Sequence, residues 1–436
     1  MINFIHGLRF DDLPDAARHA ARRCLLDLIG IAAGGSTTDA ARIIRNHAVR
    51  HFGGGARLLL DGRRASAPGA ALAGGVMIDS LDGHDRHVLV KRHMGVAILP
   101  ALLALIDSGC EVSDREFMTC FVLGYEIATR AGIALHSTAC DYHSSGAWNA
   151  LACAALGARL MKLDAEGTRH ALGIAEYHGP RSQIMRVVDH PTMLKDGSGW
   201  GAMTGISAAY LAADGFTGAP ALTVERPEVA HIWADIGERW RITEQYFKAY
   251  PVCRWAQPAI EAALALQAAH HINADQIAQV EVHTFHEGTR LATRAPGSTE
   301  EAQYSLPFPV AAALVRGQVG AAEVTGAALS DPAVLRLSSE MLLVEDATYD
   351  ARFPAERWAH VSFTLRDGQR VQSAPAIARG NPENPLSDDE LNAKYRLLAN
   401  PILGEGRAAR IQQAVGEIGG SEGVLAALLP LLFAPA

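Results

Sequence analysis

The stretch Ala147-Trp-Asn-Ala-Leu-Ala-Cys-Ala-Ala-Leu-Gly-Ala-Arg-Leu-Met-Lys-Leu163 decides the fold class of this chain. Its apolar residues recur with helical spacing, and its middle part, Leu151–Leu156, is apolar nearly all round. A helix without a polar face is typical of the centre of a domain. We therefore predict a large helical domain with this segment at its core.

Further Ala- and Leu-rich segments on both sides share this spacing. Small residues such as Gly201 and Gly205 allow two helices to approach closely. Pro258 suits the first turn of another helix, which we expect to run through Ala269. The other predicted helices of this region are Ala16–Ala33, Leu99–Ile106, Arg115–Ala134 and Trp200–Ala213.

The pattern changes after His271. Residues 280–284 alternate in the way that is typical of a strand. A second strand over Val361–Leu365 is followed by an Asp-Gly turn and a return run through Val371, which predicts a hairpin. This part of the chain is therefore expected to contain a sheet.

Helical stretches also occur at Pro309–Arg316, at Gly320–Leu329 and from Leu386 to the end. We therefore predict a mainly α fold with two domains. A large all-helical domain covers residues 1–268 and is completed by residues 390–436, and an α+β domain is inserted at residues 269–389.

The composition narrows the class of protein. The 436 residues are 49% hydrophobic, and a net charge of −8 without a basic run argues against nucleic acid as a partner. The N-terminus lacks the pattern of a signal peptide, and the most apolar stretches, such as Val424–Phe433, are too short to span a membrane. The six cysteines form no C-x-x-C pair and predict buried free thiols. We therefore expect a cytoplasmic protein without a membrane partner.

The densest group of titratable residues lies in Asp79–His93, directly before an apolar helix. This density indicates a functional site, with a polar loop that contains capping aspartates as the alternative. His84 and His87, together with Asp82 or Asp85, are suitable metal ligands. Their spacing matches no standard zinc pattern and no second cluster completes a set, so we predict no metal.

Two further candidates precede helices. His143 lies at the start of the central helix, where the helix dipole disfavours the imidazolium, so a neutral histidine suited to general-base work is expected. A hydrogen-bonded capping histidine is the alternative. Lys195 precedes a Gly-rich segment and is a candidate carboxylate ligand, with an ordinary surface lysine as the alternative. The Gly-rich run matches neither phosphate-binding glycine motif.

Lys248 and Arg254 flank a turn fixed by proline within an aromatic stretch. Two cations in such a loop favour anion binding, although lysines usually extend along the surface. No G-x-S-x-G segment is present, so hydrolase chemistry of that kind has no support.

Taken together, these segments resemble the MmgE/PrpD family, which includes 2-methylcitrate dehydratase, cis-aconitate decarboxylase and iminodisuccinate epimerase. The resemblance runs from the N-terminus to about residue Gly317. It is strongest at Asp79–Pro100, Tyr142–Leu163, Met193–Gly218, Phe247–Ala259 and Ala302–Gly317.

The resemblance implies a helical domain built from both ends of the chain, with the α+β domain inserted as a lid, usually in a homodimer. It implies that the cleft between the domains binds di- or tricarboxylates without a metal or organic cofactor. The family's active-site positions correspond to Asp82, His93, His143, Lys195 and Lys248, and we expect Arg254, Asp85, Arg86 and His87 to bind the substrate.

The chain departs from the family pattern at several places. Family members commonly read Asp-Phe-Asp-Asp-Thr-His where this chain has Asp82-Gly-His-Asp-Arg-His87. A histidine that often follows the family's lysine is replaced near Ser198, and a tyrosine of decarboxylase-like members is Phe308 here. These differences argue against a standard 2-methylcitrate dehydratase or cis-aconitate decarboxylase.

We therefore predict a cofactor-free lyase of the dehydratase type that removes a proton next to a carboxylate of a small polycarboxylate. In this hypothesis His143 is the base, His93 is the opposing acid, and Asp82 orients one of them. The two lysines and Arg254 hold the carboxylates. An epimerase of the iminodisuccinate type, a non-catalytic carboxylate-binding homologue and a metal hydrolase are the alternatives.

Overall fold

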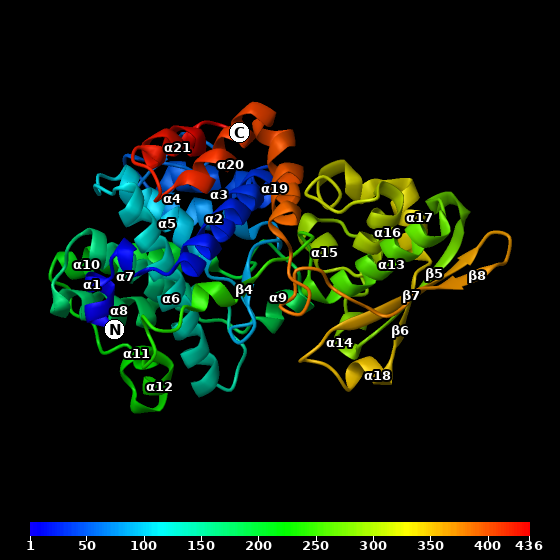
Figure 1. Ribbon diagram of the computed structural model, residues 1–436, viewed down its shortest axis with the longest axis horizontal. Coiled ribbons are helices and arrows are strands. Elements are labelled where there is room, and N and C mark those ends of the chain that lie inside the picture. The colour runs from blue at the N-terminus through cyan, green and yellow to red at the C-terminus, as the bar shows by residue number, and fades with distance from the viewer. The chain divides into compact units, whose positions relative to one another are not determined.

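The computed structural model describes residues 1–436, which divide into two compact units (Figure 1). Unit 1 consists of Met1–Ser80, His84–Tyr246 and Asn392–Ala436, and unit 2 of Leu81–Gly83 and Phe247–Leu391. The chain is mainly α-helical with small sheets, as predicted. Residues 247–268, which the sequence analysis assigned to the helical domain, are grouped with unit 2.

Unit 1 is built almost entirely from helices. Two short antiparallel strand pairs complete it, β1 (Ala56–Arg57) with β2 (Arg64–Ala65) and β3 (Arg86–His87) with β4 (Gln245–Tyr246). Its helices are α1 (Ile2–Gly7), α2 (Asp15–Gly35), α3 (Asp39–His51), α4 (Ala67–Asp79), α5 (Gly95–Asp107), α6 (Asp114–Thr138), α7 (Gly146–Leu160), α8 (Ala165–His178), α9 (Met185–Asp189), α10 (Ser198–Ala213), α11 (Leu222–Glu225), α12 (Ala230–Trp233), most of α19 (Asp388–Leu403), α20 (Glu405–Glu417) and α21 (Val424–Phe433).

The central helix of unit 1 is α7, as its all-round apolar pattern predicts. It packs against α5, α6, α8 and α10, and its alanines share one buried cluster with those of α8 and α10. Glycine makes the closest of these contacts possible. A Cβ atom on Gly205 of α10 would lie 2.5 Å from the backbone oxygen of Ala150 in α7. The backbones of α7 and α10 therefore pack directly against each other.

Several helices of unit 1 begin at a residue that caps them. The side chains of Thr38, Ser66, Ser113 and Asp164 each accept a hydrogen bond from a backbone N–H three residues further on. The α6 helix is long and apolar enough to cross a membrane by length and composition, but 94% of that window is buried within the fold. It is therefore a core helix of unit 1.

The two ends of the chain meet in unit 1. Figure 1 shows the C-terminal helices, in orange and red, beside α2, in blue, and α20 packs on α2. The ammonium of Lys394 in α19 lies 2.6 Å from the Asp27 carboxylate in α2, and both side chains are buried. This buried ion pair links the returning segment to the first long helix, and loss of either partner would leave the other charge buried and unbalanced.

Unit 2 contains one mixed sheet with the order β6-β5-β7-β8, and β9 also pairs with β7. The β5–β6 pair is parallel and the others are antiparallel. The elements are α13 (Gln257–His270), β5 (Ile277–Thr284), α14 (His286–Thr289), α15 (Thr299–Gln303), α16 (Pro307–Arg316), α17 (Pro332–Ser339), β6 (Leu342–Glu345), α18 (Ala347–Asp350), β7 (Trp358–Leu365), β8 (Arg370–Gln372) and β9 (Ala376–Ile377).

The strands of unit 2 match the sequence analysis. Val280, Val282 and Thr284 are buried on one face of β5, and the predicted hairpin joins β7 to β8 through Gly368, whose φ of +89° requires glycine.

The helix predicted over Gly320–Leu329 is wrong. This segment is a turn followed by a short 3₁₀ helix, Gly326–Ser330. The Glu323 side chain accepts a hydrogen bond from the backbone of Gly320, and Gly326 has a φ of +57°. The local hydrogen bond and the left-handed glycine therefore replace the helical repeat.

None of the six cysteines forms a disulfide, and four of them are buried as predicted. Cys140 is the exception because it is exposed, and Cys110 is half-buried.

Candidate active site

The loop between β3 and α5 holds His93 in one orientation. The His93 Nδ1 atom lies 2.7 Å from the backbone oxygen of Asp85. A carbonyl oxygen only accepts hydrogen bonds, so Nδ1 must carry the hydrogen. The backbone oxygen of His93 accepts a hydrogen bond of 3.1 Å from the Trp148 indole in α7. The tautomer and the place of this buried ring are thus set from two sides.

A carboxylate lies beside the other nitrogen of this ring. The Nε2 atom of His93 is 3.6 Å from the Asp196 carboxylate, which also forms a 3.1 Å ion pair with Arg92. Arg92 in turn donates a 3.0 Å hydrogen bond to the Tyr142 hydroxyl. A nearby negative charge favours the protonated form of a histidine, so this arrangement suits a proton donor.

His143 lies three residues before α7 and has the opposite electrostatic setting. Its buried ring nitrogens make no hydrogen bond of normal geometry. Burial lowers the pKa of His143, and the positive charge of Arg181 lowers it further. The expected neutral form is therefore supported, although the main cause is burial and not the helix terminus. A neutral imidazole of this kind suits a proton acceptor.

A second histidine supports His143. The backbone N–H of His143 donates a 3.2 Å hydrogen bond to Nε2 of His136, and the two rings are parallel with centroids 6.3 Å apart. Burial lowers the pKa of His136 to about 4, with help from His143, Lys91 and Arg92. His136 stays neutral at ordinary pH and can accept that hydrogen bond.

Lys195 lies in the turn before α10 in a left-handed backbone conformation, with a φ of +49°. A lysine rarely adopts this conformation, and such strain is often found at functional sites. The Asp79 carboxylate accepts hydrogen bonds from the backbone N–H groups of Asp196 and Ser198 and so holds the turn in place. The lysine is buried and not an ordinary surface residue.

Unit 1 therefore brings three predicted segments together, namely those around His93, His143 and Lys195. Beside them is a cavity of about 410 Å³. Lys195 and Ser144 line it on one side, and the rest of its wall is mostly apolar.

The structure uses Arg86 and His87 to hold the loop. Arg86 donates a 2.7 Å hydrogen bond to the backbone oxygen of Lys91. The His87 Nε2 atom lies 2.9 Å from the Glu244 carboxylate. Burial raises the pKa of Glu244, but the hydrogen bonds from His87 and two arginines outweigh it and lower that pKa to about 2. The neighbouring His84 has a different partner, because its Nε2 atom lies 3.5 Å from the Asp79 carboxylate.

Unit 2 brings together two other predicted residues, Asp82 and Lys248. The Lys248 ammonium lies 2.6 Å from the Asp82 carboxylate and donates hydrogen bonds to the backbone oxygens of Asp82 and Val252. Arg254 is buried in the 3₁₀ turn that precedes α13. Phe308, at the position of the family's tyrosine, is completely buried in α16.

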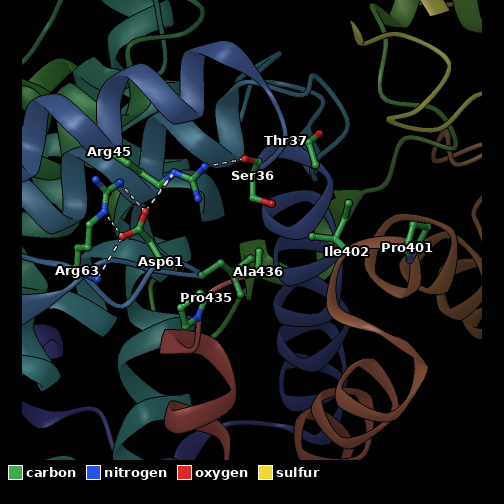
Figure 2. Close-up of a pocket in the computed structure, with 10 residues that line it drawn as sticks. Ser36, Thr37, Arg45, Asp61, Arg63, Pro401, Ile402, Pro435 and Ala436 are labelled. Carbon is green, nitrogen blue, oxygen red and sulfur yellow. Dashed lines mark hydrogen bonds and ion pairs between the residues drawn. The ribbon is translucent and has the colours of Figure 1, made fainter. Parts of the chain in front are cut away.

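A second cavity in unit 1, of about 500 Å³, contains none of the predicted residues (Figure 2). Both of its arginines already have partners. Figure 2 shows Arg45 and Arg63 converging on the Asp61 carboxylate, and Arg45 also donates to the backbone oxygen of Ser36.

Comparisons with known proteins identify the family of the chain. The MmgE/PrpD N-terminal domain matches residues 1–232 and the MmgE/PrpD C-terminal domain matches residues 250–418. The chain belongs to the MmgE/PrpD family.

Curated relatives cover nearly the whole chain. The cis-aconitate decarboxylase-like protein oryM of Aspergillus oryzae is 25% identical over 95% of this chain and 93% of its own length. The cis-aconitate decarboxylase of Mus musculus is 23% identical over 92% and 86%, and that of Homo sapiens is 24% identical over 92% and 87%. The chain is thus related to enzymes of the lyase type.

Sequence reasoning did not identify the residues that support the predicted ones. Asp196, Arg92 and Tyr142 connect the three segments, and His136 lies beneath His143. In the sequence, Arg92 directly precedes His93 and Asp196 directly follows Lys195. This adjacency was the only sequence feature that could have pointed to them. His136 lies in a helix with no such signal.

Proposed function

We propose that this chain is a cofactor-free lyase of the dehydratase type that removes a proton from the carbon next to a carboxylate of a small di- or tricarboxylate. The observation that carries the proposal is the contrast between two histidines of unit 1. His143 has a lowered pKa, whereas His93 has a carboxylate 3.6 Å from Nε2. One ring is suited to take a proton and the other to give one.

The proton next to a carboxylate is very weakly acidic, so its removal requires stabilisation of an enolate-like dianion. Lys195, held in its strained turn, supplies a fixed positive charge for this purpose. We assign Arg254 and Lys248 to the same task, with Lys248 acting in part through its ion pair with Asp82.

The proposed reaction begins when His143 takes the proton and the electron pair of the C–H bond moves into the enolate. If the next carbon bears a hydroxyl group, His93 protonates it and the C–O bond breaks, which releases water and leaves a double bond. If His93 instead returns a proton to the opposite face of the same carbon, the product is the epimer. Epimerisation is therefore the alternative outcome of the same site.

Decarboxylation is a second candidate, because the relatives named above are cis-aconitate decarboxylases or decarboxylase-like. In that case a C–C bond breaks, CO₂ leaves, and His93 protonates the carbon. Phe308 weakens this candidate, because it is a buried hydrocarbon where decarboxylase-like members have a tyrosine.

The test is proton NMR of the purified protein in D₂O with citrate, 2-methylcitrate, cis-aconitate and iminodisuccinate. Loss of an α-proton signal with a new olefinic signal supports dehydration, and loss without one supports epimerisation. Release of CO₂ from cis-aconitate supports decarboxylation. A non-catalytic carboxylate-binding homologue binds members of this panel but exchanges no proton, and that result would overturn the proposal.

We also propose a homodimer. Four large apolar side chains that line the 410 Å³ cavity are exposed, namely Ile43, Met193, Leu194 and Trp200. A cluster of this kind suits an interface with a second copy. The absence of disulfides among the buried cysteines is consistent with the cytoplasm. The role of unit 2 as a lid stays a prediction.

A further inference from the structure

The 410 Å³ cavity beside the candidate active site combines a few polar groups with a large apolar wall. Lys195 and Ser144, which line it, are both buried. Its other polar side chains are exposed, namely Ser182, Gln183 and Arg186. Pockets for small molecules, of about 300–1,000 Å³, have this composition, with a mostly apolar wall and a few polar groups that fix the ligand.

The least exposed apolar residues of this cavity come from α3, α4 and the segment of α9. We call them the inner wall, which consists of Ala40, Ile44, Val76, Ile184 and Val187. They are distinct from the four exposed apolar residues assigned to the proposed dimer interface, which line the same cavity. A carboxylate or hydroxyl group placed against the inner wall would lose its hydrogen bonds with water, which is costly. The inner wall therefore suits hydrocarbon.

The inner wall is joined to the segment that carries the proposed base. The backbone N–H of Ser144 donates a 2.8 Å hydrogen bond to the backbone oxygen of Ser182, and the N–H of Ile184 donates one of 2.9 Å to that of Tyr142. These bonds lie on either side of His143, which forms a short antiparallel bridge with the same segment. The backbone thus fixes the cavity and the base relative to each other.

We propose that the substrate of this chain carries an apolar substituent of several carbon atoms, which the inner wall binds while Lys195 binds the adjoining carboxylate. The inference rests on the proposed function, because it names the substrate class of the same site. It makes Ile44 and Val187 specificity-determining residues, and it favours an alkyl-substituted polycarboxylate over citrate itself.

The length of the substituent gives a direct measure of this contact. Burial of each CH₂ group raises an association constant by about fourfold. In a series of ligands that share the same two carboxylates, the contribution of the carboxylates is constant. A rise of affinity along such a series therefore reports burial of the alkyl chain.

The experiment is isothermal titration calorimetry of the purified protein with methylsuccinate, butylsuccinate and hexylsuccinate. The association constant should rise by at least about tenfold from the methyl to the butyl compound, and again to the hexyl compound until the cavity is filled. Lys195→Gln should weaken all three ligands by a similar factor, because it removes the charge at the carboxylate and leaves the inner wall intact.

Two tryptophan variants of α3 show where the alkyl chain lies. Ile44→Trp fills part of the cavity, so the ratio of the hexyl to the methyl association constant should fall by at least about tenfold. Val49→Trp is the matched control, since Val49 is half-buried in the same helix but does not line the cavity. Val187→Thr, which places a hydroxyl group in the inner wall, gives the same readout if Ile44→Trp does not fold. Circular dichroism and light scattering report the fold and the mass of each variant.

A rise along the series that Ile44→Trp or Val187→Thr reduces and Val49→Trp does not supports the inference. Equal affinities along the series overturn it, and so does a rise that the inner-wall variants leave unchanged. Equal affinities together with a dimer that dissociates in Ile44→Trp would also overturn it and would assign the cavity to the second copy.

The failure of this inference and that of the proposed reaction are distinguishable, because binding is measured without turnover. Proton exchange with citrate and equal affinities along the alkyl series would remove the alkyl site and keep the reaction. A rise along the series without proton exchange for any ligand would keep the alkyl site and remove the reaction.

Discussion

At the scale of the residue, the chemistry depends on what surrounds two chemically identical side chains. His93 has a fixed tautomer because its Nδ1–H meets a carbonyl, and it has Asp196 beside Nε2. His143 has neither partner and is held from below by His136. These surroundings come from segments far apart in the sequence, so one imidazole is arranged to accept a proton and the other to donate one.

Replacing His143 with alanine is expected to abolish turnover, with a loss of at least about a hundredfold, because no other group replaces the base. The measurement is the rate of deuterium incorporation, with circular dichroism to show that the fold is intact. His178→Ala is the matched control, since His178 is exposed at the end of α8. Wild-type turnover in His143→Ala would remove this residue from the proposal.

His136 predicts a pH dependence of stability. Its pKa in the folded protein is about 4, below the ordinary value of 6.5, so the unfolded chain binds the proton more readily between these values. The free energy of unfolding should therefore fall as the pH drops from 6.5 towards 4, by about 2 kcal/mol after solvent screening.

Urea unfolding of the wild type and of His136→Gln at several pH values measures this effect. The variant lacks the titrating group, so its stability should depend less steeply on pH in that window. Equal slopes for the two proteins would contradict the assignment.

At the scale of the element, the site depends on the contact between α7 and α10. His143 and Lys195 lie just before these two helices. The distance between the helices therefore sets the positions of these two residues. The predictions of α7 and α10 were confirmed because their all-apolar patterns are strong. Residues 320–329 misled the same reasoning, since glycine conformation and one side-chain hydrogen bond outweighed the apolar spacing.

Gly205→Ala is expected to destabilise the protein by about 1–3 kcal/mol, because the new methyl group would meet α7 backbone in a packed core. Activity should fall as well, since α7 and α10 must separate and the candidate residues lie just before these helices. Thermal unfolding and deuterium incorporation measure the two effects.

Gly406→Ala in α20 is the control for this substitution. A Cβ atom there meets nothing within 4 Å, so alanine should raise stability by about 0.5–1 kcal/mol through its helix propensity. Unchanged stability and activity in Gly205→Ala would contradict the prediction and would show that the two helices can move apart at no cost.

At the scale of the whole molecule, unit 1 is assembled from both ends of the chain, and Lys394 and Asp27 join those ends in its interior. The sequence predicted that a second unit exists more easily than it predicted where that unit begins. Residues 247–268 contain α13, a helix like those of unit 1, but it packs on β7 and α16. Helical spacing alone does not reveal which partner a helix will have.

Leu194→Asp is expected to convert the proposed dimer to a monomer, because a carboxylate would be buried in an apolar interface. Light scattering after size-exclusion chromatography measures the mass. Phe216→Asp is the control, since Phe216 is similarly exposed but does not line the cavity. A monomeric wild type, or a dimer in the Leu194 variant, would contradict the proposed interface.

The amino-acid sequence by itself determined the helical class, the strands of the inserted region and the family, because apolar spacing and short motifs are local properties. It also identified His93, His143 and Lys195 as candidates. Only the tertiary structure decided which groups surround them, including Asp196, His136 and His84. The reason is physical, since charge, burial and hydrogen-bond partners depend on chain segments that only folding brings together.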